Sequence, residues 1–426
     1  MAVYTVSGGG DALKIQLNSA PDNSVILVEP GVYTPLNPGG TTKNVQVIGM
    51  DKDTCIIDGG GTSCLYDGRE NYGSTKSNIK LYNFTLRNGT NDRQGRNHDQ
   101  NNIHAVLYGG TYINCNFHHL IATQRYYTDS STGNLKRSWI EAVTFRPLMY
   151  GCEIHDCSSD THWDFQPVVQ YNLYIHDNVH KTLTTAESED GTMVNLDGQA
   201  MYYNMRNGIL VNNVLCGCVE GGMQNCIIAN NISCSAEDRI YSSYRGNTLC
   251  YRGGSVVRKN NVYYNNKEFN SFSSFNAQGS TTQMHWANCV FVQNNAYNGG
   301  NANKTAYITL GHQGSLKHCW LDGTHTISMS DHGDRAKRVV QCITDGTDPG
   351  FVDPANNDFH LKPNSPLIAM GEPSLLYSIN DLAGRPFKDP PAIGPYEFYE
   401  DGAKLGWKMP NYMVPFGGFS PLGDVH

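Results

Sequence analysis

The chain has 426 residues with a formal net charge of −8, and only 16% of its residues are charged, while Gly (44) and Tyr (25) are abundant. Few strong helix formers and many turn-forming Gly and Asn residues favour an all-β chain of short strands. The acidic balance without a Lys/Arg cluster argues against nucleic acid as a partner, and no apolar run is long enough for a membrane span.

The N-terminal residues MAVYTVSGGGDALKIQ lack the charged and then apolar segments of a signal peptide. We therefore expect a protein that bypasses the general secretion route or has lost its leader. The first buried strand is predicted at residues 25–28 (VILV), with Pro30 and Gly31 forming the turn that follows it.

Short segments marked by a cysteine recur along the chain, and the residue two positions after the cysteine is usually apolar. They read YINCNFHH, MYGCEIHD, MQNCIIAN, WANCVFVQN, LKHCWLDG and VVQCITDG, and contain Cys115, Cys152, Cys226, Cys289, Cys319 and Cys342. Side chains alternate faces along a strand, so both marked positions point the same way.

A strand with so few inward positions cannot form its own core. Stacked rungs solve this problem, because each inward residue then lies on its equivalent in the next rung. We therefore expect Cys115, Cys152, Cys226 and Cys289 to share one inner column as reduced thiols. By the same alternation, Cys216 and Cys218 are predicted to form a stacked core pair.

The chain resembles the right-handed parallel β-helix superfamily, which includes pectate lyases, chondroitinase-B-like lyases, polygalacturonases and phage tailspikes. The likeness lies in these rungs, in the opening at residues 8–35, and in a closing stretch that starts at DPGFVD, runs through FHLKPNSPLI and ends with DLAGRPFKDPPAIGPYEF. It implies an all-β solenoid over residues 1–398 with long inserted loops. Residues 399–426 are expected to form an irregular cap or a docking segment.

The resemblance implies that the flank of the rod engages a polysaccharide, and residues 153–206 hold the densest set of polar side chains. Glu187 and Glu189 project from one face of an extended strand, and they resemble the Ca²⁺ ligands of chondroitinase-B-like lyases. In those enzymes a Lys follows the pair closely. Here the next basic residue is Arg206, and Lys181 precedes the pair instead.

A hydrolase is the alternative chemistry for this stretch, with Asp164 facing Glu187 across a cleft. His162 is a further catalytic candidate, and Trp163 is a candidate for sugar contact. The Asp-Asp and Gly-His-Gly strings of polygalacturonases do not occur. A purely structural alternative also stands, since Ile-His-Asp recurs at 154–156 and 175–177, as expected of a stacking ladder.

A second candidate patch is the segment AEDRIYSSYRGN. Tyr241 and Tyr244 offer flat apolar faces for sugar CH groups, and Arg239 and Arg245 can clamp a carboxylate or sulfate. We expect this segment to be a loop that contacts glycan. The alternative is an ordered loop without a ligand.

Three functions follow: a polysaccharide lyase or hydrolase, with the lyase favoured and Ca²⁺ as its cofactor; a non-catalytic virion spike or surface adhesin that binds host glycans; and a structural filament subunit. The expected partners are a polysaccharide and further copies of the chain, as a homotrimer or through the C-terminal segment. The expected location is extracellular or on a virion surface.

Overall fold

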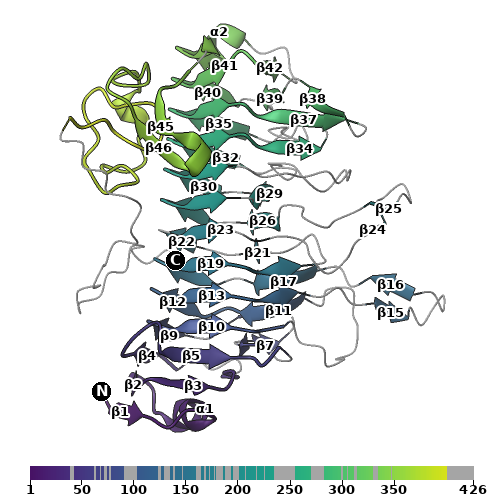
Figure 1. Ribbon diagram of the computed structural model, residues 1–426, viewed down its shortest axis with the longest axis vertical. Helices are drawn as coiled ribbons and strands as arrows, with labels where there is room; N and C mark the ends of the chain where they lie inside the picture. Colours follow the sequence, from purple (N-terminus) through teal and green to yellow (C-terminus); the bar gives the residue numbers. More distant parts are fainter. Residues whose placement is uncertain are drawn as a thin grey trace.

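Each coil of the chain contributes one short strand to each of two long parallel sheets, and the coils stack into a rod in the computed structural model (Figure 1). The structure describes residues 1–38, 43–61, 64–67, 69–71, 74–75, 78–90, 103–122, 126–128, 135–137, 140–145, 147–159, 165–166, 169–171, 173–176, 178, 186–187, 193–194, 201–206, 208–216, 218–224, 226–234, 255–269, 283–298, 301–304, 306–310, 314–329, 334–346 and 348–400.

Sheet A runs the length of the rod. Its 13 described strands are, in spatial order, β1 (Val3–Val6), β2 (Ser24–Val28), β4 (Val45–Gly49), β9 (Ile79–Tyr82), β12 (Thr111–Ile113), β18 (Leu148–Tyr150), β22 (Val169–Tyr171), β27 (Ile209–Val211), β30 (Cys226–Ala229), β32 (Ser255–Lys259), β35 (Gln283–Ala287), β40 (Ser315–Lys317) and β43 (Val339–Val340). Spatial order follows chain order, as expected of a solenoid.

Sheet B lies beside it and also follows chain order. Its 12 described strands are β3 (Gly31–Tyr33), β5 (Cys55–Asp58), β10 (Thr85–Arg87), β13 (Asn116–His118), β19 (Glu153–His155), β23 (Tyr174–His176), β28 (Val214–Cys216), β31 (Ile232–Cys234), β33 (Val262–Tyr264), β36 (Val290–Val292), β41 (Trp320–Asp322) and β44 (Ile343–Gly346).

Sheet C closes the middle coils with six described strands: β6 (Tyr66–Asp67), β11 (Ile103–Tyr108), β17 (Ile140–Phe145), β21 (Phe165–Gln166), β26 (Met201–Arg206) and β29 (Cys218–Gln224). Two smaller parallel pairs extend this side of the coil: β14 (Ile121–Ala122) with β20 (Ser158–Ser159), and β39 (Ala306–Leu310) with β42 (His325–Met329).

Hairpins carry the inserted segments. They are β7 (Arg69–Asn71) with β8 (Ser74–Thr75), β15 (Tyr126–Thr128) with β16 (Leu135–Arg137), and β24 (Ala186–Glu187) with β25 (Met193–Val194). A further sheet joins β34 (Lys267–Phe269), β37 (Asn295–Asn298) and β38 (Asn301–Lys304).

A single residue in the left-handed conformation turns the chain from sheet A into sheet B. These residues are Asn83, Asn114, Gly151, Asn212, Asn230, Asn260, Asn288, His318 and Gln341. Asn and Gly adopt this conformation at the lowest cost. Asparagine holds six of these nine corner positions, which explains part of its abundance in the sequence.

The residue after each corner points inward and forms one buried column. Cys115, Cys152 and Cys289 lie in it as predicted, and the thiols of Cys152 and Cys115 are joined by a hydrogen bond. Burial raises the pKa of Cys152 well above its usual range. None of the described cysteines forms a disulfide, which confirms the prediction of reduced core thiols.

The prediction for Cys226 is wrong. Cys226 begins β30 in sheet A, opposite Val256, and the column position of its rung is held by Asn231. The predicted pair of Cys216 and Cys218 stays a prediction, because only the backbone of Cys218 is described. The Sγ of Cys216 lies 3.4 Å from that of Cys234 in the next rung. Register between rungs, rather than spacing within one strand, decides which thiols meet.

Three asparagines continue the column between the cysteines. The Oδ1 of Asn231 accepts from the N–H of Asn213 at 2.8 Å, and the Oδ1 of Asn261 accepts from the N–H of Asn231 at 2.8 Å. Each side chain thus satisfies a buried N–H of the preceding coil that a thiol cannot satisfy as well.

The described ends of the rod differ. Helix α1 (Ala12–Ser19) closes the N-terminal end, where Leu13 and Leu17, one helical turn apart, are buried in the core. This helix was not predicted from the sequence. At the other end the four-residue helix α2 (Arg335–Arg338) precedes the last coil (Figure 1).

The chain then leaves the coil, and residues 348–400 pack on the flank beside the last coils (Figure 1). This flank segment, as we call it, holds the antiparallel pair β45 (Phe351–Asp353) and β46 (Asp358–Leu361) and two short 3-10 helices, η2 (Pro354–Asn356) and η3 (Pro373–Leu375). Residues 401–426, most of the predicted cap, lie outside the described residues, and the domain boundary near residue 398 stays a prediction.

Candidate functional site

The outward face of sheet B changes character halfway along the rod. In the C-terminal half, from β28 to β36, its outward side chains are apolar or thiol groups, and the flank segment packs against them. Its Phe359 packs edge-on against Tyr264, with ring centroids 5.3 Å apart, and Leu361, Leu367 and Ile393 join the same cluster. Here the chain itself supplies the cover.

The N-terminal half of the same face carries polar side chains. From β5 to β19 the strands are in register, so that Asp58, Arg87, His118 and His155 form one outward row. We call this half the polar face. A parallel second row on it consists of Ile56, Thr85, Asn116 and Glu153.

An ion pair opens the polar face at β5 and β10. The Nε of Arg87 lies 2.7 Å from an Oδ of Asp58, and the Asn88 amide donates to the same carboxylate. Burial alone would raise the pKa of Asp58, but hydrogen bonds from the Gly60 N–H, Arg87 and Asn88 outweigh it and lower the pKa. The Arg87 side chain stays 34% exposed, so its remaining N–H groups can reach a ligand.

Two histidines, His118 and His155, continue the row, and His119 lies beside them. The rings of His118 and His155 stack with centroids 5.3 Å apart, and the Nδ1 atoms of His118 and His119 lie 2.6 Å apart. Burial, followed by the neighbouring His119, His155 and Arg87, lowers the pKa of His118 to about 4. His118 is therefore neutral at pH 7, with a ring nitrogen of each kind, one donor and one acceptor.

The polar face thus offers hydrogen-bond donors and acceptors in a straight line, one set per coil at a spacing of about 4.8 Å. Within the described residues no group of three or more His, Cys, Asp or Glu side chains is arranged to hold a metal ion. The arrangement suits an extended ligand with repeated polar groups rather than a compact one.

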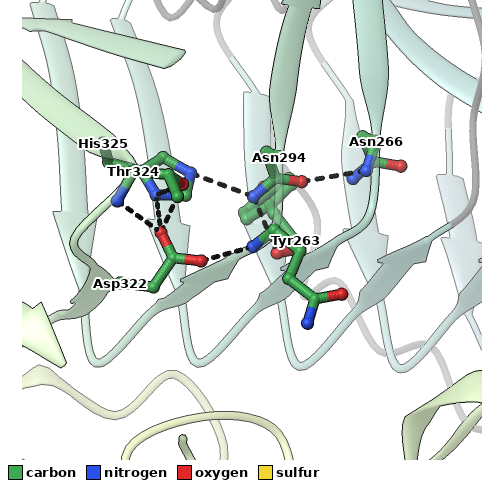
Figure 2. A network of polar contacts seen from close by, with 7 residues as sticks. Tyr263, Asn266, Asn294, Asp322, Thr324 and His325 are labelled. Atoms are coloured by element: carbon green, nitrogen blue, oxygen red, sulfur yellow. Dashed lines mark hydrogen bonds and ion pairs between the residues drawn. The ribbon is translucent and has the colours of Figure 1, made fainter. Parts of the chain in front are cut away.

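A second polar cluster lies inside the last coils (Figure 2). The Nδ1 of His325 lies 2.6 Å from Oδ1 of Asp322, and its Nε2 lies 3.1 Å from the amide of Asn294. The imidazole is fully buried. Because both ring nitrogens are used inside the protein, this His-Asp pair is structural rather than catalytic.

Asn266 and Asn294 form a second column of stacked asparagines, and this cluster lies at the end of that column. Asn294 accepts from the N–H of Asn266 and donates to the carbonyl of Tyr263, and the His325 ring takes the place of the next asparagine (Figure 2). Burial alone would raise the pKa of Asp322. Hydrogen bonds from His325, the Gln293 N–H and Thr324 outweigh it and lower the pKa to about 2.

The site residues predicted from the sequence fall where the structure describes no side chains. Lys181, His162, Trp163, Asp164, Glu189, Arg239, Tyr241, Tyr244 and Arg245 lie outside the described residues. Only the backbone of Glu187 and Arg206 is described. Glu187 lies in β24 opposite Met193, and Arg206 lies in β26 opposite Gln224. The Ca²⁺ site therefore stays a prediction.

The stacking ladder predicted from the repeated Ile-His-Asp is confirmed for the backbone, since Ile154 pairs with Ile175 and His155 with His176. Sequence reasoning missed Asp58, Arg87 and His118. The available signal was the third residue of each sheet B strand (IID, TLR, NFH, EIH), which changes along the chain while the middle residue stays apolar.

No protein-family model matches the sequence, and no curated protein matches it. Among solved structures, the chain is similar to the pectate lyase Pel9A, with 11% identity, a TM-score of 0.43, and 94% of this chain and 97% of that one covered. It is also similar to the Dettilon tailspike protein, with 11% identity, a TM-score of 0.33, and 75% and 64% covered.

A third similar structure is the PL6 family polysaccharide lyase Pedsa3628 from Pseudopedobacter saltans, with 10% identity, a TM-score of 0.34, and 93% of this chain and 100% of that one covered. The chain itself folds as a parallel β-helix, because successive coils stack in chain order in sheets A and B. This confirms the fold predicted from the sequence. Among the described residues, no helix has the length and apolar character needed to cross a membrane.

Proposed function

We propose that this β-helix binds an extended polysaccharide along the polar face. The observation that carries the proposal is the row of Asp58, Arg87, His118 and His155 in register over four consecutive coils. A polysaccharide carries hydroxyl groups on every sugar ring, and along this row it meets a hydrogen-bonding side chain at each coil. The neutral imidazole of His118 suits this role, because its Nδ1 bonds to His119 and its Nε2 is left to bond to a hydroxyl group.

A rod whose side binds sugar polymers fits an extracellular or virion-surface protein, and we include that location in the proposal. The similar solved structures include two proteins named as lyases and one named as a tailspike. The proposal itself stands on the side chains of the polar face.

Binding of a panel of neutral and uronic-acid polysaccharides, measured by affinity electrophoresis, tests the proposal. We expect retardation by at least one polymer, weakened about three- to tenfold in Arg87→Gln and His118→Gln, since each variant removes about one hydrogen bond. His360→Gln, on the flank segment, serves as the control and should behave as the wild type. Wild-type binding that Arg87→Gln and His118→Gln leave unchanged would contradict the proposal, as would no binding at all.

Cleavage of the bound polymer is a separate proposal that rests on the sequence. Incubation with the same panel is read for absorbance of unsaturated sugar ends, which reports a lyase, and for new reducing ends, which also report a hydrolase. A lyase signal that is lost in Glu187→Ala, in Lys181→Ala and on chelation of Ca²⁺ would support the Ca²⁺-dependent enzyme. Silence in both readouts together with a threefold assembly in solution would support the non-catalytic spike.

A further inference from the structure

A group of basic side chains gathers on the outward face of sheet A near the C-terminal end of the rod. Lys259, Ala287 and Lys317 follow one another in register on β32, β35 and β40, and Ala229 precedes Lys259 on β30. His285 stands in the adjoining row. The sequence showed no such cluster, because only the coil register brings these distant positions together.

The two lysines face each other across a small residue. Neighbouring strands lie about 4.8 Å apart, so the backbones of Lys259 and Lys317 are about 10 Å apart with only the methyl group of Ala287 between them. The long flexible stem of each lysine allows both ammonium groups to approach one point above that methyl group.

The two lysines of this cluster lack an acidic partner among the residues that the structure describes. Neither Lys259 nor Lys317 has an acidic side chain within ion-pair distance among the described residues. The nearby charges that lower the pKa of His285, after burial, are the cations Lys317 and Arg338. Glu372 lies 4.0 Å from His318 at the corner and pairs with that histidine rather than with a lysine of the cluster. Two neighbouring lysines without an acidic partner are unexpected in a chain that has 39 acidic and 31 basic residues.

Lys259 is partly withdrawn from water as well. Burial lowers its pKa, which means that the charged form is desolvated without a compensating anion. A bound carboxylate or sulfate would supply the missing compensation.

The flank segment borders this row. The Asn230 amide donates to the carbonyl of Asn380 at 3.1 Å, and the Asn288 amide donates to that of Glu372 at 3.2 Å. Ala229, Lys259, Ala287 and Lys317 each come directly before a corner residue, so the lysine pair lies next to the flank segment.

We propose that Lys259 and Lys317 bind the carboxylate or sulfate group of an acidic polysaccharide above Ala287, with His285 beside it. This inference rests on the proposed function for the class of ligand, and it adds a second binding site on sheet A that is separate from the polar face. Nucleic acid is disfavoured, since binding its phosphates would require a longer basic stripe than three coils of an acidic protein supply.

Isothermal titration calorimetry of the full chain with four probes tests the inference: an oligogalacturonate, a sulfated dextran oligomer, an unmodified dextran oligomer and a single-stranded DNA oligonucleotide. We expect one or both acidic sugars to bind more tightly than unmodified dextran, and the two arms distinguish carboxylate from sulfate. Lys259→Gln and Lys317→Gln should each weaken that binding about three- to tenfold. Lys80→Gln, on the same face of sheet A but far along the rod, should leave it unchanged.

Equal binding of charged and uncharged sugars, or acidic sugar binding that both lysine variants leave intact, would overturn the inference. Preferential binding of the oligonucleotide would do so too. These failures are distinguishable from failure of the proposed function, because Arg87→Gln and His118→Gln report on the polar face. Sugar binding that depends on Arg87 and His118 but not on the lysines rejects this inference alone.

Discussion

At the scale of single residues, buried polar side chains hold the coils together where thiols and aliphatic groups cannot. Asp322 illustrates this, because its carboxylate accepts from two backbone N–H groups, the Thr324 hydroxyl and His325 (Figure 2). Removing its charge leaves several buried donors without a full partner.

We expect Asp322→Asn to lower the free energy of unfolding by about 2–4 kcal/mol, measured by chemical denaturation at pH 7. The folded-state pKa of Asp322 is about 2, below its usual 3.8. Its contribution is therefore complete above pH 4 and is lost as the pH falls toward 2. The difference between wild type and variant should shrink over that interval. Asp53→Asn, at an exposed loop position, is the control, and an equal loss there would contradict the account.

His118 gives a pH dependence of the same sign as that of Asp322, but at higher pH. Its folded-state pKa is about 4, against 6.5 for an ordinary histidine, so the unfolded chain takes up a proton first. The stability of the wild type should fall as the pH drops from 6.5 to 4. In His118→Gln the melting temperature should depend less on pH over this range, as recorded by thermal circular dichroism. An identical pH slope in both proteins would show that the ring is not held neutral.

At the scale of elements, the flank segment decides which part of sheet B is available for binding. It covers the apolar outward residues of β28 to β41 and leaves the polar face to other contacts. Phe359 anchors it between Tyr264 and Phe351, with both ring distances 5.3 Å.

We expect Phe359→Ala to destabilise the flank segment by about 3 kcal/mol, since it removes a buried aromatic ring. Limited proteolysis should then cut within residues 348–400 at lower protease concentration, while the strands near the N-terminus resist as before. Tyr377→Ala, at an exposed position of the same segment, is the matched control. Unchanged protection of the segment in Phe359→Ala would contradict the assigned anchor.

At the scale of the whole molecule, the stacked-coil architecture could be predicted because one column repeats a recognisable residue. Cys115, Cys152 and Cys289 carry that signal in the sequence and lie where it predicts. Asn231 breaks the pattern, because satisfying a backbone N–H of the neighbouring coil matters more there than apolar packing.

Neither candidate binding surface could be predicted. The polar face depends on register between strands separated by inserted segments of unequal length. The pairing of Lys259 with Lys317 across Ala287 depends on the same register. Sequence reasoning instead favoured a dense run of polar residues around Glu187, because local density is visible without knowledge of register.

Hydrogen exchange measured by mass spectrometry, with and without the polysaccharide that binds most tightly, tests the central claim most directly. The account predicts slower exchange on binding in β10, β13 and β19, the strands of the polar face, and little change in β33 and β36 beneath the flank segment. Protection confined to other parts of the chain, with β10, β13 and β19 unaffected by a bound polymer, would contradict it.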